Sequence, residues 1–378
     1  MWYYVVLNSK YMYIDNIFTS NSTVLPQPPL SSSYEKDRCI DKFDRHSWTD
    51  KCCLLKKNKY QHIYCKKNIL RFDHSKLQIV NMTASMFDAK TMVELPYSES
   101  SEIKYNFQDV LLYNLGVGCT DLQFMHEKHP NFSVFPTFPI RFAGSGAWER
   151  FPRTTPGLNI DGERYMELLA PLPVPKSRKD TVSVFASAKV CGLHDKKTGA
   201  LCEFETLIKD KDGKDLVKLI NGEFYRGIKK LGDIGPFPSY GKTYSESVPP
   251  PKRMPDMNVR LEIPNNAAHI YRLSGDYLPH HIDPAAAKLV GYDRVILHGL
   301  CTLGRVTSAL LTTLCSNQVN RFKRVKMRFS APVYMGEQLN IQIWYDGPGR
   351  VIFQVVPRER NEICVSHAYF EFKVDAKM

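Results

Sequence analysis

Alternating apolar and polar residues predict a run of strands in the first half of the chain. Residues 181–190, 201–208 and 223–228 alternate in side-chain character, which is typical of strands with one buried face. Residues 209–213 (KDKDG) follow the second segment and are typical of a hairpin turn. We therefore expect antiparallel strands in this part of the chain.

A second group of strands is predicted near the C-terminus. The same alternation marks residues 322–329, 338–345, 351–356 and 362–374. A glycine-proline-glycine turn at residues 347–349 separates the second strand from the third. These strands are expected to form an antiparallel meander.

The chain between these two groups carries the start signals of two helices. Asp283 is suited to cap a helix that begins at Pro284, and Gly291 supplies a stop signal after it. A longer helix is predicted to begin at His298 and Gly299, because leucines follow near helical spacing. A long helix followed by a meander indicates an α+β fold, with the helix buried on one face of the sheet.

The segment before the first of these helices is predicted to be a strand. Residues 269–273 alternate in character and end at Ser274 and Gly275, which predicts a strand running into a tight turn. Asp276 would then lie just beyond the end of that strand.

Composition divides the chain into an N-terminal segment and two domains. Residues 1–85 show no convincing periodicity, so we expect them to be disordered or to be an extension of the gene model. Residues 98–242 form the first predicted domain and residues 256–378 the second. A proline-rich linker, residues 243–255, separates the two domains.

Composition also narrows the class of protein. A length of 378 residues and a hydrophobic fraction of 43% suit a globular protein of two domains. No apolar run reaches the roughly 18 residues of a membrane span, so none is predicted. The ten cysteines lack regular spacing and predict reduced thiols. The cysteines and histidines of residues 39–65 lack C-x₂-C pairs, so we predict no metal site.

Half of the net charge of +12 belongs to residues 1–85. In the remainder, Arg324, Lys326 and Arg328 alternate with apolar residues and predict a strand with one basic face. A solvated face is the first interpretation, and a basic rim for a phosphate-bearing ligand is the second. No nucleic-acid-binding module accompanies the charge, so no nucleic-acid partner is predicted.

One short stretch carries the candidate chemistry. Asp276 and His281 lie five residues apart in a loop, where a carboxylate and an imidazole can reach one water molecule. The first N–H groups of the following helix, Gly299 foremost, are suited to stabilise an oxyanion. Together they suit the addition of water to a double bond conjugated with a thioester carbonyl. A lone aspartate or histidine in a loop is more often a cap or a surface residue.

The motif context favours catalysis. Residues 275–284 (GDYLPHHIDP) and 298–304 (HGLCTLG) resemble the hydratase motif of the MaoC-like, (R)-specific enoyl-CoA hydratase 2 family, whose members typically read GDxNPxHIDP and HGLCTxG. Further similar stretches extend the resemblance over residues 105–374. The resemblance implies a double hot-dog fold whose first copy is non-catalytic. It also implies a homodimer that needs no cofactor beyond its acyl-CoA substrate.

The resemblance also assigns roles to residues. It implies that Asp276 and His281 activate water and that the backbone of Gly299 donates to the thioester oxygen. The residues expected to support this pair or to bind the substrate are Tyr271, Asp283 and His298 for support, and Gly162, Lys196, Phe329, Asp161 and Glu127 for binding.

Three residues depart from the family pattern: Leu278 replaces the motif asparagine, Asp161 a common histidine and Asn131 a frequent aspartate. Loss of a hydrogen bond to a reacting group costs roughly 1.5–3 kcal/mol, which slows a reaction about ten- to a hundredfold. A weakened or inactive acyl-CoA-binding protein is therefore the alternative to an enoyl-CoA hydratase. A hot-dog thioesterase or dehydratase is a third hypothesis, although a thioesterase would not need this loop.

The C-terminal tripeptide suggests a location. Ala376, Lys377 and Met378 resemble the SKL peroxisomal address, which an import receptor reads. Combined with a β-oxidation-type motif, the tripeptide predicts a peroxisomal protein.

Overall fold

The computed structural model describes residues 89–142, 159–196, 198–226 and 239–374, together with six strands within residues 3–78. The chain divides into two compact units, Met1–Met86 and Phe87–Met378. Each unit is described separately below.

The first unit holds short antiparallel strands. These are β1 (Tyr3–Asn8), β2 (Tyr11–Asn16), β3 (Cys53–Lys57), β4 (Tyr60–Tyr64), β5 (Arg71–Asp73) and β6 (Lys76–Gln78). The first four pair in the order β2-β1-β4-β3, and β5 pairs with β6. The side chains of the cysteines and histidines considered above as metal ligands lie outside the described residues. Whether the natural protein contains this unit stays a prediction.

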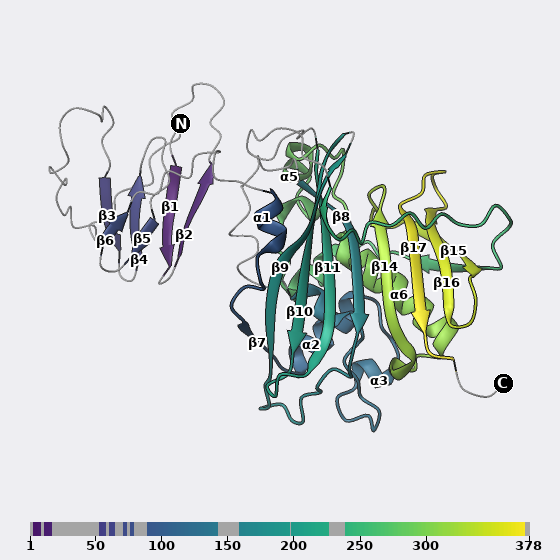
Figure 1. Ribbon diagram of the computed structural model, residues 1–378. Coiled ribbons are helices and arrows are strands. Elements are labelled where there is room, and N and C mark those ends of the chain that lie inside the picture. The colour runs from purple at the N-terminus through teal and green to yellow at the C-terminus, as the bar shows by residue number, and fades with distance from the viewer. Residues whose placement is uncertain are drawn as a thin grey trace. The chain divides into compact units, whose positions relative to one another are not determined.

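The described strands of the second unit form one antiparallel sheet (Figure 1). They are β7 (Ser101–Tyr105), β8 (Asn159–Leu168), β9 (Val182–Lys196), β10 (Gly199–Lys209), β11 (Asp215–Arg226), β12 (Tyr240–Gly241), β13 (Met257–Glu262), β14 (Phe322–Phe329), β15 (Gln338–Tyr345), β16 (Arg350–Pro357) and β17 (Val365–Phe372). Their order is β12-β9-β10-β11-β8-β14-β17-β16-β15-β13, and β7 also pairs with β9.

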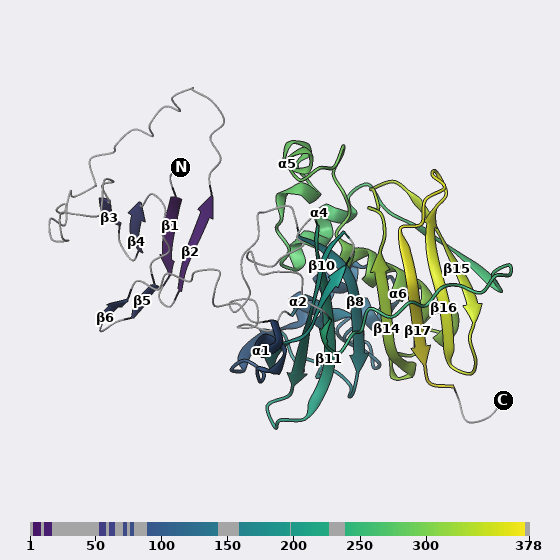
Figure 2. The same cartoon turned by 45° about the horizontal axis from the view of Figure 1, so that its top comes forward.

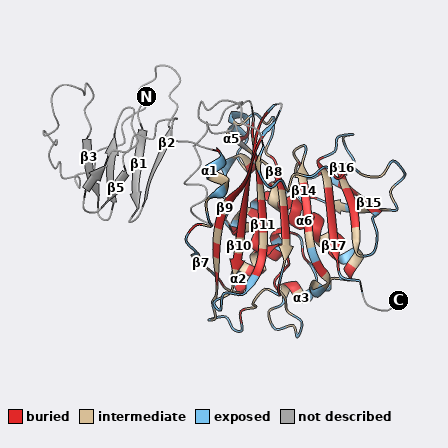
Figure 3. Cartoon of the chain, viewed as in Figure 1, coloured by how far each residue is buried: buried red, intermediate tan, exposed pale blue. Residues whose placement is uncertain are grey.

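Helices cover one face of this sheet. The α-helices are α1 (Ala89–Glu94), α2 (Phe107–Gly116), α3 (Leu122–Met125), α4 (Ala267–Tyr271), α5 (Pro284–Leu289) and α6 (Gly299–Cys315). The 3₁₀ turns are η2 (Phe138–Arg141), η5 (Arg272–Ser274), η6 (Pro279–His281) and η7 (Val319–Arg321). Figure 2 shows α2 and α6 behind the strands, where their apolar side chains join the core. The strands carry buried residues along most of their length (Figure 3).

The sheet consists of two halves that each wrap a helix. One half contains strands β7–β12 and helix α2, and the other contains strands β13–β17 and helix α6. The pairing of β8 with β14 joins the halves. This arrangement is a double hot-dog fold of the α+β class, as predicted. The segment that links the halves crosses the sheet face opposite the helices (Figures 1 and 2).

Most predicted elements are confirmed. The predicted strands 322–329 and 338–345 coincide with β14 and β15. The turn at 209–213 joins β10 to β11, and Gly213 has a φ of +83°. Asp283 caps α5, because its carboxylate accepts a hydrogen bond from the Ala285 N–H at 2.8 Å. No disulfide is present among the described cysteines.

The predicted strand at residues 269–273 is wrong. This segment belongs to α4 and η5, with Ala267, Ala268 and Tyr271 buried at helical rather than alternating positions. Burial of this helical face against α2 therefore outweighs the local alternation. Gly275, with a φ of +117°, then ends the turn and leads directly into Asp276.

The two central helices approach closely at a glycine. A Cβ atom at Gly304 would lie 2.3 Å from Val117 Cγ1, so any larger residue forces the helices apart. We expect Gly304→Ala to lower the free energy of unfolding by about 1–3 kcal/mol. Denaturant unfolding measures this change, and Thr313→Ala on the exposed side of α6 is the matched control. Equal stability of the two variants would contradict the close packing.

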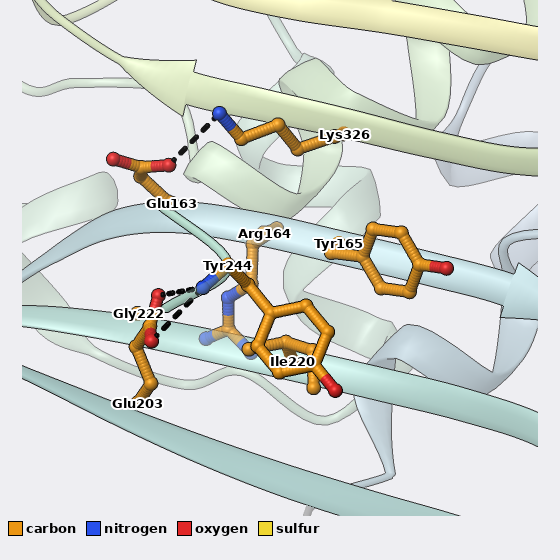
Figure 4. A pocket seen from close by; sticks show the side chains of 8 residues that line it. All are labelled: Glu163, Arg164, Tyr165, Glu203, Ile220, Gly222, Tyr244 and Lys326. Atoms are coloured by element: carbon orange, nitrogen blue, oxygen red, sulfur yellow. Dashed lines mark hydrogen bonds and ion pairs between the residues drawn. The ribbon is translucent and has the colours of Figure 1, made fainter. Parts of the chain in front are cut away.

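The basic face predicted for β14 is not a solvated face. Lys326 is 1% exposed and its Nζ lies 3.2 Å from Glu163 Oε2, while Arg328 Nε lies 2.7 Å from Glu163 Oε1. Burial lowers the pKa of Lys326, and the Glu163 carboxylate opposes that shift. Figure 4 shows this ion pair beside a small cavity that Tyr244 of the linking segment helps to line. These charges therefore hold the two halves together at the β8–β14 junction.

Candidate active site

A tight loop places Asp276 at the start of the candidate site. After Gly275 the chain passes through Asp276 into η6, which begins at Pro279. The backbone N–H of Leu278 donates to Asp276 Oδ1 at 3.2 Å. This bond fixes the carboxylate relative to η6, which carries His281.

Two buried histidines face this aspartate. His281 is 6% exposed, and its Nδ1 lies 2.9 Å from the carbonyl oxygen of Ile296. We assign the proton to Nδ1, which donates to that carbonyl, so Nε2 keeps its lone pair. His298 is 1% exposed, and its Nε2 lies 3.3 Å from the backbone oxygen of Asp276. One ring nitrogen or carboxylate oxygen from each of these three residues lies within 4.8 Å of the others.

The two imidazoles are neutral at neutral pH. Burial lowers the pKa of His281 to about 3, with the neighbouring His298 contributing in the same direction. Burial likewise lowers the pKa of His298 to about 4. Neutral His281 therefore keeps a ring nitrogen with a lone pair that can accept a hydrogen bond from water.

The same three residues meet the distance requirement for a metal site, but their ring geometry does not suit one. The rings of His281 and His298 stack with centroids 3.7 Å apart and planes 25° apart. A metal ion bound by imidazole nitrogen lies near the ring plane, because the lone pair does. Two nearly parallel stacked rings therefore cannot both direct a lone pair at one ion. The arrangement favours acid–base chemistry over metal binding.

The start of α6 supplies the candidate oxyanion donors. His298 occupies the N-cap position without a side-chain capping bond and Gly299 is the first residue of the helix, so the first-turn N–H groups have no partner within the helix. A Cβ atom at Gly299 would lie 3.3 Å from Phe329 Cε2 on β14. The predicted substrate-lining residue Phe329 therefore lies directly against the predicted oxyanion donor.

The aromatic ring of Tyr271 packs beside the ring of His298. Its ring is buried, with its centroid 5.1 Å from that of His298 and 6.1 Å from that of Tyr113 on α2. Its predicted supporting role is thus consistent with packing against His298.

β8 brings a second carboxylate toward Asp276. Burial raises the pKa of Asp161, the charge of Asp276 adds to this shift, and Arg164 opposes it from 2.8 Å. The next residue, Gly162, sits at a register shift where a Cβ atom would lie 3.1 Å from the Gly222 carbonyl oxygen. This part of β8 therefore brings Asp161 within electrostatic reach of Asp276.

Three predicted residues lie apart from this group. Lys196 is exposed at the end of β9, and Glu127 lies in the loop after α3, 3.2 Å from Arg178. Asp283 is exposed and caps α5. Within the described part of the chain, no hydrogen bond or ion pair joins any of them to Asp276, His281 or His298, so their predicted roles stay predictions.

Sequence reasoning missed His280. This residue follows Pro279 in η6, and its ring centroid lies 4.1 Å from that of His281. The signal available in the sequence was the histidine pair within the motif.

The buried histidines make stability pH-dependent. The unfolded chain binds protons below a pH of about 6.5, whereas folded His281 binds one only near about 3, so stability falls as the pH falls through this window. We expect the melting temperature to fall between about pH 7 and 5, and to fall less in His281→Gln. Thermal scans test this, with exposed His269→Gln as the control. An equal fall in both variants would contradict the assignment.

Comparison with known proteins defines the class. The family described as MaoC like domain matches residues 246–366, and that described as MFE-2 hydratase 2 N-terminal domain matches residues 103–227. A crystal structure of a MaoC-like dehydratase from Phytophthora capsici superimposes with a TM-score of 0.68 at 34% identity, covering 77% of this chain and all of that one. Fold and site thus define a MaoC-like double hot-dog protein.

The curated relatives narrow this class. A probable enoyl-CoA hydratase 2 from Dictyostelium discoideum is 34% identical over 67% of this chain and 86% of its own length. The peroxisomal multifunctional enzyme type 2 of Mus musculus is 33% identical over 74% of this chain, but only 37% of the mouse protein is covered. The chain belongs to the enoyl-CoA hydratase 2 family, and it spans less than half of the multifunctional relatives from Mus musculus and Drosophila melanogaster.

Proposed function

We propose that the protein hydrates trans-2-enoyl-CoA to (3R)-3-hydroxyacyl-CoA in fatty acid β-oxidation. The observation that carries this proposal is the convergence of Asp276, neutral His281 and the start of α6 on one site. Family membership supports the substrate class. The chemistry needs a base, a proton donor and an oxyanion contact, and each has a candidate at the site.

With these groups alone, the atoms and protons of the hydration reaction balance. His281 Nε2 takes a proton from water as the water oxygen bonds to C3, and Asp276 accepts the second hydrogen bond of that water. The π electrons of the double bond move into an enolate, which the Gly299 N–H stabilises through the thioester oxygen. The enolate then takes the proton from the His281 imidazolium at C2. Water is added across the double bond, and the protein returns to its starting state.

Leu278 argues less strongly against turnover than its sequence position suggests. Leu278 is 54% exposed, and its contact with Asp276 is made by the backbone N–H, which any residue except proline provides. The backbone contact to Asp276 is therefore kept, and the alternative of an acyl-CoA-binding protein without turnover rests on the missing asparagine side-chain bond alone.

We also propose a homodimeric peroxisomal protein that uses no cofactor beyond its acyl-CoA substrate. Relatives whose names describe them as peroxisomal support this location. The predicted address at Ala376, Lys377 and Met378 lies outside the described residues. No described helix has the length and apolar character needed to span a membrane. Deletion of the tripeptide from a tagged full chain tests the location. A diffuse distribution in cells both with and without the tripeptide would remove this support.

Mass spectrometry of one reaction mixture tests the proposed activity. Incubating the full chain with trans-2-enoyl-CoA is expected to add the mass of one water to the thioester. Release of free CoA would instead indicate a thioesterase, and binding without any mass change would indicate an acyl-CoA-binding protein. Asp276→Ala provides the background rate, and a native rate no higher than this background would overturn the proposal.

A further inference from the structure

Two histidines hold residues 242–248, the first part of the segment that links the halves, on the sheet face opposite the helices (Figures 1 and 2). His194 lies on β9, and its Nε2 lies 3.2 Å from the carbonyl oxygen of Lys242. His367 lies on β17, and its Nδ1 accepts a hydrogen bond from the Val248 N–H at 3.1 Å. An imidazole therefore holds each end of residues 242–248.

His194 acts as a hydrogen-bond donor at its end. Its Nε2 faces two oxygens, the Lys242 carbonyl and Glu203 Oε2 at 3.1 Å, so we assign a proton to this nitrogen. A neutral imidazole protonated at Nε2 and a charged imidazole both carry that N–H. The Glu203 carboxylate also accepts the Tyr244 N–H at 2.9 Å (Figure 4). This end of the segment therefore keeps its hydrogen bonds when His194 gains a proton.

His367 acts as an acceptor at the other end. The Val248 N–H can donate only to a ring nitrogen that has a lone pair, and a charged imidazole has none. Among the residues that the structure describes, this N–H donates to no other acceptor. Val248 is 8% exposed and belongs to an apolar cluster that includes Ile352 and Tyr369. A proton on Nδ1 of His367 would therefore set two donors against each other beside a buried residue.

The charges around His367 favour its neutral form. Lys326 Nζ donates to the His367 carbonyl at 3.1 Å and to the Glu246 carbonyl of the linking segment at 2.8 Å. Burial lowers the pKa of His367, and Arg328 and Lys326 act in the same direction. The Glu163 carboxylate opposes this shift. An attached segment therefore disfavours a proton on His367.

The direction of the pH dependence follows from this difference. In a detached segment the pKa of His367 returns to its ordinary value of about 6.5. Because the detached state then binds the proton more readily, attachment is strongest above this pH. Attachment weakens as the pH falls below it, by up to about tenfold per pH unit.

We propose that His367 is a pH-sensitive latch, whose neutral imidazole attaches the Val248 end of the linking segment to the sheet and whose protonation releases it. The Lys242 end stays attached, because His194 donates in both of its protonation states. Release exposes the apolar cluster beneath Val248. The inference does not depend on the proposed hydratase function, since none of these residues belongs to the candidate active site.

The backbone of His367 permits a matched pair of variants. Its φ of +45° lies in the left-handed region, which glycine and asparagine adopt more readily than other residues. In His367→Asn, the side-chain oxygen replaces Nδ1 as an acceptor and stays uncharged when the pH falls. His367→Gly has no side-chain acceptor at any pH. The two variants therefore imitate a permanently closed and a permanently open latch.

Amide hydrogen exchange of the full chain between about pH 7.5 and 5 tests the latch. Exchange is resolved at single amides by mass spectrometry and corrected for its intrinsic pH dependence. In the native chain we expect the protection of the Val248 amide to fall about tenfold or more, and that of the Tyr244 amide to stay unchanged. His367→Asn should keep high Val248 protection throughout, and His367→Gly should show low protection throughout.

The Tyr244 amide also reports whether each variant keeps the segment folded on the sheet. Native Val248 protection that is as independent of pH as in His367→Asn would overturn the proposal. Equal Val248 protection of His367→Gly and the native chain near the upper pH would also overturn it. Loss of Tyr244 protection together with that of Val248 would contradict release from one end.

Discussion

Replacing His281 with glutamine lowers kcat for hydration of trans-2-enoyl-CoA by about 10²–10⁴-fold, the range expected when a general base is lost. Glutamine keeps an amide donor for the Ile296 carbonyl, which His281 Nδ1 contacts at 2.9 Å in the native chain. It cannot, however, take a proton from water. Initial rates at saturating substrate measure the effect.

The matched control is His269→Gln, which makes the same substitution at an exposed position of α4. We expect this variant to keep the native rate. Comparable circular dichroism of the two variants would exclude unfolding as the cause of the loss in His281→Gln. A rate for His281→Gln within a few fold of the control would contradict the assignment of His281 as the base.

The second large effect is on stability. Glu163→Gln removes the carboxylate that pairs with both Lys326 and Arg328 across the β8–β14 junction. Lys326 then remains as a buried charge without its anionic partner, and breaking one side of such a pair costs about 3–5 kcal/mol. We therefore expect a much lower midpoint of denaturant unfolding.

Glu102→Gln is the control for this change, because it breaks the Lys104–Glu102 pair at an exposed position of β7. Exposed ion pairs contribute little to stability, so its midpoint should match that of the native chain. If both glutamine variants unfold at the same denaturant concentration, the β8–β14 ion pair is not a major stabilising contact.

The pattern of apolar and polar residues predicts those strands and helices whose buried residues recur at one regular spacing. Alternating apolar residues mark most of β15 and the segment of β14 from Val325 to Phe329, and the leucine spacing after Gly299 marks α6. The alternation in residues 269–273 predicts a strand wrongly because α2, which is distant in the chain, determines which face of this segment is buried. The pattern around Lys326 predicts a solvated face because its partner Glu163 lies on β8, more than a hundred residues earlier in the chain.

The sequence predicts those residues of the candidate site that lie in the motif and are placed by nearby turns and helix starts. Asp276, His281 and His298 are brought together by two helix starts and a glycine turn that the sequence signals directly. The contact of Phe329 with Gly299 needs the pairing of α6 against β14, which only the fold supplies. The ring contact between His280 and His281 arises within η6, and the order of residues in the motif does not reveal it.

The stereochemistry of water addition tests the central claim most directly. The full chain is incubated with trans-2-enoyl-CoA in heavy-oxygen water, and the product is compared with (3R) and (3S) standards by chiral chromatography and mass spectrometry. The proposed function predicts (3R)-3-hydroxyacyl-CoA with the heavy oxygen at C3. Unreacted enoyl-CoA, a free acid or the (3S) alcohol would contradict it.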